Sequence, residues 1–270
     1  MLGLVGLILP VQADESRNGS KPRVVIYHYP ARGCQGFVKW DCPVFAAYGD
    51  GTVIWRRGWL ASLEALAITQ NQSTEMIIQK AETSVATYSG RTFVLTGSSD
   101  PDETTLWANG QTLTILGDWQ KARVLEVVEG GNDAESITRT NAQEHKLWAS
   151  LPAEVRMILA SLKEFDAPGR STWHPKQLML LLQPPIITHR DKIVWPAEWP
   201  QTFAPAPNNT AMKQIELPGR MLDEVLAKIP NDGESKAILL GDEIRYAELR
   251  LVFPGIKPGV EPKALNKEPL

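Results

Sequence analysis

The segment 43–57, PVFAAYGDGTVIWRR, decides the fold that this sequence predicts. Two apolar runs flank Gly49-Asp50-Gly51, and glycine tolerates the positive φ that tight hairpin turns impose. We therefore expect two antiparallel strands here. In the second strand, Val53 and Trp55 would share one side and Thr52, Ile54 and Arg56 the other, the alternation of a sheet with one wetter face. A phosphate-binding loop would need more glycines and a following helix, so we interpret the turn as structural.

The same pattern of strand, turn and strand occurs twice more. TTLWANGQTLTIL (104–116) places Asn109-Gly110 between β-rich arms, and this dipeptide is the strongest short hairpin signal in the chain. KAILLGDEIRYAELRL (236–251) surrounds Gly241-Asp242 in the same way. Single strands are expected at RVVIYHY (23–29) and at the apolar run KQLMLLLQ (176–183), each of which is closed by proline.

Helices are expected where apolar residues recur every three or four positions. The segments with this spacing are 59–68, 73–88, 151–165 and 219–230. In 73–88 we expect Met76, Ile77, Ala81 and Val85 to face inward. In 151–165 the expected inward residues are Val155, Ile158, Leu159 and Leu162. In 219–230 they are Leu222, Val225, Leu226 and Ile229. Hairpins with intervening helices predict an α+β protein with a mostly antiparallel sheet.

The N-terminus MLGLVGLILPVQA has the order of a signal peptide, with an apolar core at 2–9 and small residues before the expected cleavage after Ala13. We expect residues 1–13 to be removed and 14–22 to form a flexible mature end. The alternative is a frayed apolar N-terminus of a cytosolic protein. We further expect one domain over 23–255, subdivided if at all near the proline-rich stretch 184–218, and a disordered tail at 256–270. No later run reaches the roughly 20 apolar residues of a membrane-spanning helix.

The composition limits the partners and the redox chemistry. The chain has 270 residues, 43% of them hydrophobic, and a formal charge of -3 from 28 basic and 31 acidic side chains. No basic tract supplies the field that nucleic-acid binding needs, so nucleic acid is excluded as an expected partner. Cys34 and Cys42 are the two cysteines, and in an exported protein we expect them to form a disulfide. Two unrelated thiols are the alternative.

PVFAAYGDGTVIW, SDPDETTLWANGQTLTI and WPAEWP, in this order between residues 43 and 255, resemble a family of bacterial exported proteins without an assigned activity. The shared features are a YGDGTV-type hairpin, an acidic-Pro-x-x-Thr-Thr hairpin entry and a Trp-Pro segment. The resemblance implies a periplasmic or secreted bacterial protein. It carries no catalytic residues over to this chain.

The residues that carry chemistry form no complete motif. Asp100, Asp102 and Glu103 are the strongest polar cluster, but a calcium loop needs more oxygen ligands at patterned spacing, and turn capping explains the acids more simply. His28 and His174 flank aromatic and proline residues, which favours half-buried structural histidines, although a triad assembled in space stays open. We therefore expect no metal and no cofactor, and the sequence names no catalytic residue.

Nine tryptophans are numerous for this length. Trp55, Trp107 and Trp148 are expected in the core, where large aromatic rings gain most from burial. Trp195 and Trp199 lie in the proline-rich stretch and are a candidate binding surface, or else they attach that loop to the body.

The sequence thus favours a non-catalytic exported protein that binds a protein, peptide or glycan, or that assists an envelope process. The rival hypothesis is a periplasmic hydrolase whose site assembles only in three dimensions. A calcium-stabilised structural protein is a third hypothesis.

Overall fold

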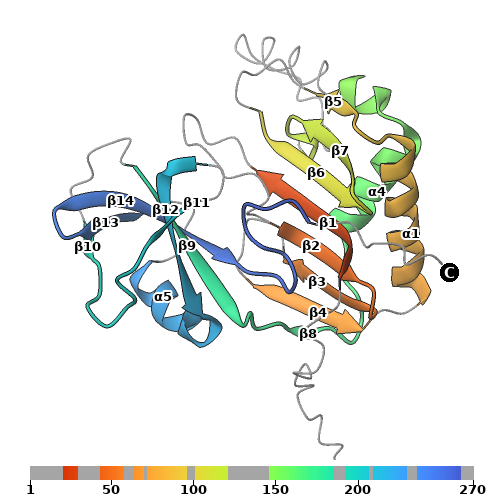
Figure 1. Cartoon of the computed structure of the whole chain (residues 1–270). Coiled ribbons are helices and arrows are strands. Elements are labelled where there is room, and N and C mark those ends of the chain that lie inside the picture. The colour runs from red at the N-terminus through yellow and green to blue at the C-terminus, as the bar shows by residue number, and fades with distance from the viewer. Residues whose placement is uncertain are drawn as a thin grey trace, which may run out of the picture.

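The structure is a computed structural model, and it describes residues 21–29, 43–57, 64–69, 72–95, 101–120, 146–184, 192–206, 209–229 and 236–262. The described residues form two sheets with helices packed on them (Figure 1), so the predicted α+β class is confirmed. The predicted signal peptide (1–13), the Cys34–Cys42 disulfide and Asp100 lie outside the described residues and stay predictions.

The first sheet has eight strands in the order β5-β7-β6-β1-β2-β3-β4-β8. All neighbouring strands are antiparallel except β5 and β7, which are parallel. Both hairpins predicted for this half of the chain are present as β2–β3 and β6–β7. In order along the sheet, the strands are Thr92–Val94 (β5), Gln111–Leu116 (β7), Glu103–Ala108 (β6), Pro22–Tyr29 (β1), Pro43–Tyr48 (β2), Thr52–Arg56 (β3), Ala65–Thr69 (β4) and Ser171–Thr172 (β8).

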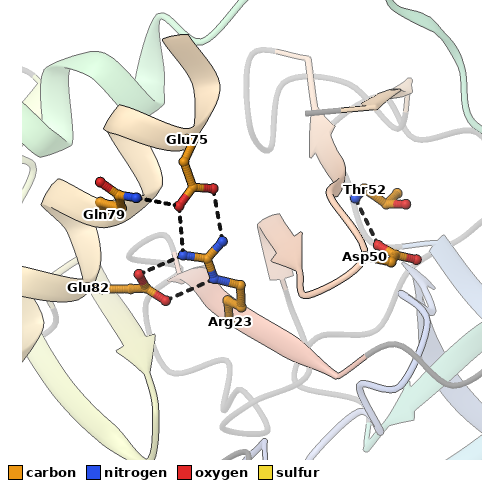
Figure 2. Close-up of polar contacts among 6 residues, drawn as sticks. All are labelled: Arg23, Asp50, Thr52, Glu75, Gln79 and Glu82. Atoms are coloured by element: carbon orange, nitrogen blue, oxygen red, sulfur yellow. Dashed lines mark hydrogen bonds and ion pairs between the residues drawn. The ribbon is translucent and has the colours of Figure 1, made fainter. Parts of the chain in front are cut away.

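The Gly49–Gly51 turn is closed by its own backbone and by one carboxylate. Gly51 has a φ of 83°, and its N–H donates to the Tyr48 carbonyl at 3.1 Å. The Thr52 N–H donates to Asp50 Oδ1 at 2.8 Å (Figure 2). This contact uses the aspartate side chain inside the turn, which agrees with the structural interpretation of the hairpin.

The second sheet has six strands in the order β10-β13-β14-β9-β12-β11. It contains the third predicted hairpin, β13–β14, and the predicted strand β9 at its centre. The proline-rich stretch 184–218 supplies both edge strands and the ten-residue β12. The strands are Ile193–Val194 (β10), Lys236–Leu240 (β13), Glu243–Leu251 (β14), Gln177–Gln183 (β9), Asn209–Pro218 (β12) and Ala204–Ala206 (β11).

Three of the four expected helices are present. They are Gln72–Thr87 (α1), Ala153–Lys163 (α4) and Leu222–Lys228 (α5), which follows the 3₁₀ turn Gly219–Met221 (η3). The expected helix over 59–68 is wrong in its described part, because 65–68 belong to β4 and pair with β3. The inward positions of α4 are confirmed. In α1 the expectation for Met76 is wrong: its side chain is 53% exposed, and Ile78 takes the inward position.

Sheet 1 is covered on both faces (Figure 1). One hydrophobic core lies between this sheet and helices α1 and α4, and a second core lies between the two sheets. The predicted wetter face is therefore wrong, because Ile54 is 1% exposed and Arg56 only 5%. Trp55, Trp107 and Trp148 are buried as predicted.

The ordered body is longer than the predicted domain of 23–255. Pro22 belongs to β1, although 14–22 was predicted to be flexible. Ile256 is buried in the core between the sheets, although 256–270 was predicted to be disordered. The chain stays ordered beyond residue 255 because Phe253 and Ile256 both pack into this core. The Ile256 N–H donates to the Phe253 carbonyl and closes a turn between them.

Candidate functional site

A buried polar cluster lies where β1 and β6 run side by side. His28 of β1 is directly opposite Thr104 of β6 in the strand register. The His28 Nδ1 and Thr104 Oγ1 atoms are 2.9 Å apart, and the Trp119 indole Nε1–H donates to the same Oγ1 at 3.0 Å. Three segments of the chain therefore meet at one threonine hydroxyl.

The hydrogen bonds fix the environment of one imidazole nitrogen. An indole N–H can only donate, so the Thr104 oxygen accepts from Trp119, and the same hydroxyl is hydrogen-bonded to His28 Nδ1 in a direction that the tautomer of the imidazole sets. Burial, together with the nearby positive charges of Lys163 and Arg56, lowers the pKa of His28 from 6.5 to about 3, so the imidazole is neutral.

The distance between His28 and Thr104 is that of a nucleophile and its base, but the position is closed to substrates. Hydroxyl and base within about 2.6–3.2 Å is the geometry of activated serine and threonine nucleophiles. Thr104 is 0% exposed and His28 is 7% exposed. A scissile bond has no access to a hydroxyl in this position, so the cluster as it stands holds β1, β6 and the chain after β7 together.

Aromatic and charged groups extend this cluster toward the helices. The Trp119 ring stacks on the Trp148 ring with centroids 6.0 Å apart and an interplanar angle of 18°. Lys163, at the end of α4, has its pKa lowered by burial, which the negative charge of Asp118 partly opposes. The cluster thus joins the ends of β1 and β6 to the helical layer.

The candidate binding surface at Trp195 and Trp199 is wrong, because both rings are inside the protein. Trp195 is 7% exposed and Trp199 is 2% exposed. Their rings meet edge to face at 5.1 Å, and Trp195 also packs on Phe203 at 5.3 Å. The Trp199 indole N–H donates to Glu224 Oε1 at 2.5 Å. These contacts attach the proline-rich loop to α5, which was the alternative interpretation of the two tryptophans.

The other sequence candidates are not brought together. His174 is exposed, on the chain between β8 and β9. The Glu103 carboxylate accepts from the Thr105 hydroxyl at 3.0 Å, and the Asp102 carbonyl accepts from the Gly117 N–H at 2.7 Å. Within the described part of the chain, no three histidine, cysteine, aspartate or glutamate side chains are grouped as metal ligands.

A second polar cluster, formed by Arg23, Glu75 and Glu82, was not predicted from the sequence. The guanidinium of Arg23 on β1 binds two carboxylates of α1 at once (Figure 2). Its Nη1 and Nη2 donate to Glu75 at 2.9 and 3.0 Å, and its Nε and Nη2 donate to Glu82 at 3.1 and 2.9 Å. Gln79 donates to Glu75 at 2.8 Å. These hydrogen bonds raise the pKa of Arg23 and lower that of Glu75.

The Arg23 cluster clamps the helix to the sheet. Arg23 is 52 residues from Glu75 and 59 from Glu82 in sequence, so periodicity alone does not pair them. The sequence does contain an indication of this cluster, because Glu75 and Glu82 are two helical turns apart and share one face of α1. Acidic residues repeated on the face next to a sheet predict a basic partner on that sheet.

No protein-family model matches this chain, and neither a curated protein nor a solved structure is significantly similar to it. No helix among the described residues combines the length and apolar content that crossing a membrane requires.

Proposed function

We propose that this chain is a non-catalytic exported protein, periplasmic or secreted, that binds a protein, peptide or glycan partner or assists an envelope process. The observation that carries the proposal is the closed state of the His28–Thr104 pair. The Thr104 hydroxyl lies 2.9 Å from His28 Nδ1, but Thr104 is 0% exposed. Its oxygen also accepts a hydrogen bond from the Trp119 indole. At this pair, burial supports a structural role over chemistry that needs contact with a substrate.

The outer surface of the helical layer supports a binding role. Most large apolar side chains of α1 and α4 face the core, but Met76 is 53% exposed and Met157 is 56% exposed. Methionine is flexible and polarisable, and it is common on surfaces that adapt to a partner. These two helices cover the face of sheet 1 that is remote from sheet 2 (Figure 1), so a partner would dock on the helical side of the molecule.

Site-specific photo-crosslinking tests the binding role. A photoreactive amino acid is placed at Met76 or Met157 in the full-length chain, and at exposed Glu216 of β12 as the matched control. Irradiation in cells of the source organism should give a discrete adduct from the two helical positions and none from the control. Adducts of equal yield from all three positions, or from none, would contradict a partner at the helical layer.

Export is tested separately. The full-length chain with a C-terminal tag is expressed, the cells are fractionated, and the N-terminus of the recovered protein is sequenced. The proposal expects the protein outside the cytosol, beginning at Asp14. Recovery of intact Met1 on protein that stays in the cytosol would remove export from the proposal.

The rival function is a hydrolase, and the 2.9 Å separation of His28 Nδ1 and Thr104 Oγ1 favours it. Purified mature protein is assayed against chromogenic esters, phosphate esters and glycosides. The rival requires turnover that Thr104→Val abolishes and that Thr105→Val, on the next residue of the same buried strand, retains. We expect no turnover above the buffer rate from any of the three proteins. Turnover with this pattern of loss would replace our proposal by the rival.

A further inference from the structure

The core between the two sheets contains polar atoms among apolar side chains. Tyr48 is 2% exposed and Trp107 is 0% exposed, and both belong to this core. Within the described structure, the Tyr48 hydroxyl and the Trp107 Nε1–H make no hydrogen bond. Buried polar groups in native proteins are almost always bonded to protein or to ordered water, because an unbonded one loses its hydration without replacement.

The strand register places these two rings on one face around a region of short side chains. Trp107 of β6 is opposite Val25 of β1, and Val25 is opposite Ala46 of β2. Tyr48 is two residues beyond Ala46 and points to the same core. Val25 and Ala46 carry shorter side chains than the two aromatic residues that share this face with them.

Tyr27 lies on the same face, at the other side of the row. Tyr27 is two residues beyond Val25 in the direction opposite to Tyr48, because β1 and β2 are antiparallel. Burial raises the pKa of Tyr48 well above 10, and the nearby phenol of Tyr27 raises it further. The two phenol groups therefore interact electrostatically on this face of the sheet.

We infer that an internal water molecule binds between the sheets, accepting from Trp107 Nε1 and exchanging a hydrogen bond with the Tyr48 hydroxyl. Water can accept and donate, which matches a donor-only indole beside a hydroxyl. Both rings are almost fully buried, which favours a molecule as small as water over a larger ligand. An ion is disfavoured, because the neighbouring core side chains are apolar. The site is structural, and it is independent of the proposed partner.

Two measurements on the full mature chain test the inference. In the wild type, nitrogen-edited NOE and rotating-frame experiments should both show a cross-peak between the Trp107 indole proton and water, with opposite signs, which is the pattern of a long-lived, bound water molecule. Tyr48→Phe should raise the unfolding equilibrium constant about fivefold, since one hydrogen bond to water is lost. Tyr88→Phe, at a half-buried position in the turn after α1, is the control and should change it less than twofold.

Two results would overturn the inference of a bound water molecule. If no water bound the hydroxyl, Tyr48→Phe would remove an unbonded buried group and leave the unfolding constant unchanged or lower it. That result, or the absence of a water cross-peak from an assigned Trp107 indole, overturns the inference. The indole measurement needs no substitution, so it decides the question even if the Tyr48→Phe protein fails to fold.

Discussion

Acidification is the perturbation that most directly tests the structural role of His28. In the native state the imidazole is neutral, its Nδ1 is hydrogen-bonded to Thr104 Oγ1, and its pKa is about 3. In the unfolded chain the same group has its ordinary pKa of 6.5. Between these two values, the unfolded state binds a proton that the native state does not bind. Stability is therefore fully present above pH 6.5 and falls as the pH decreases toward 3.

The magnitude follows from the two pKa values. Each pH unit below 6.5 lowers the free energy of unfolding by about 1.4 kcal/mol. From pH 7 to pH 4.5 the loss is then about 2–3 kcal/mol, which is a substantial part of the stability of an ordinary domain. The cause is mainly burial, to which the nearby charges of Lys163 and Arg56 add.

The assay compares the pH dependence of two proteins. Urea unfolding is measured at pH 7, 6, 5 and 4.5 for the wild type and for His28→Asn, which keeps a polar side chain beside Thr104 but has no group that titrates in this range. Hydrogen bonds to basic side chains hold the pKa of Glu75 and of Glu243 below 4.5, so these carboxylates titrate mostly below this range. The wild type should lose about 2–3 kcal/mol over the series. His28→Asn starts less stable and should lose much less.

The control is His174→Asn, which removes an exposed imidazole between β8 and β9. This variant should keep the wild-type pH dependence. If the wild type and His28→Asn instead lost stability in parallel, His28 would titrate alike in the native and unfolded states. The closed, neutral cluster described above would then be incorrect.

Three further predictions concern the turn, the clamp and the proline-rich loop. Gly51→Val should lower the unfolding free energy by about 1–3 kcal/mol, because φ at this position is 83°, while Gly49→Ala, without a positive φ, should change it little in the same urea titration. Arg23→Met should lower it by about 1–2 kcal/mol, and the loss should shrink when both proteins are measured in 1 M salt, since the ion pairs are partly exposed. Trp199→Ala should cost about 3–5 kcal/mol in thermal unfolding, whereas a tryptophan displayed on a surface would cost far less.

The sequence predicts the hairpins because their turn chemistry is local. Asn109 and Gly110 adopt φ values of 51° and 78°, the left-handed conformation that this dipeptide favours. The inward stripe of α4 is equally local, since one helix with one apolar face has one way to lie on a sheet. In both cases the deciding residues are within a few positions of one another.

The candidate site depends on contacts that are distant in sequence. His28 and Thr104 are 76 residues apart, and only the pairing of β1 with β6 makes them neighbours. Sequence reasoning identified His28 as a structural histidine but could not name Thr104 or Trp119 as its partners. Trp195 and Trp199 were assigned to a candidate surface for the same reason: nothing local to the proline-rich loop shows that α5 supplies Glu224.

The wetter face expected for sheet 1 was wrong, and the sequence contained a signal against it. RVVIYHY in β1 and VFAAY in β2 are almost continuously apolar, whereas a sheet with one solvated face alternates. Continuous apolar strands require a second covering layer, and sheet 2 is that layer. Both cores cover the central strands of sheet 1, so these strands leave little surface for a partner. If the proposed partner docks on the helical layer, Met76 and Met157 are the positions to test first.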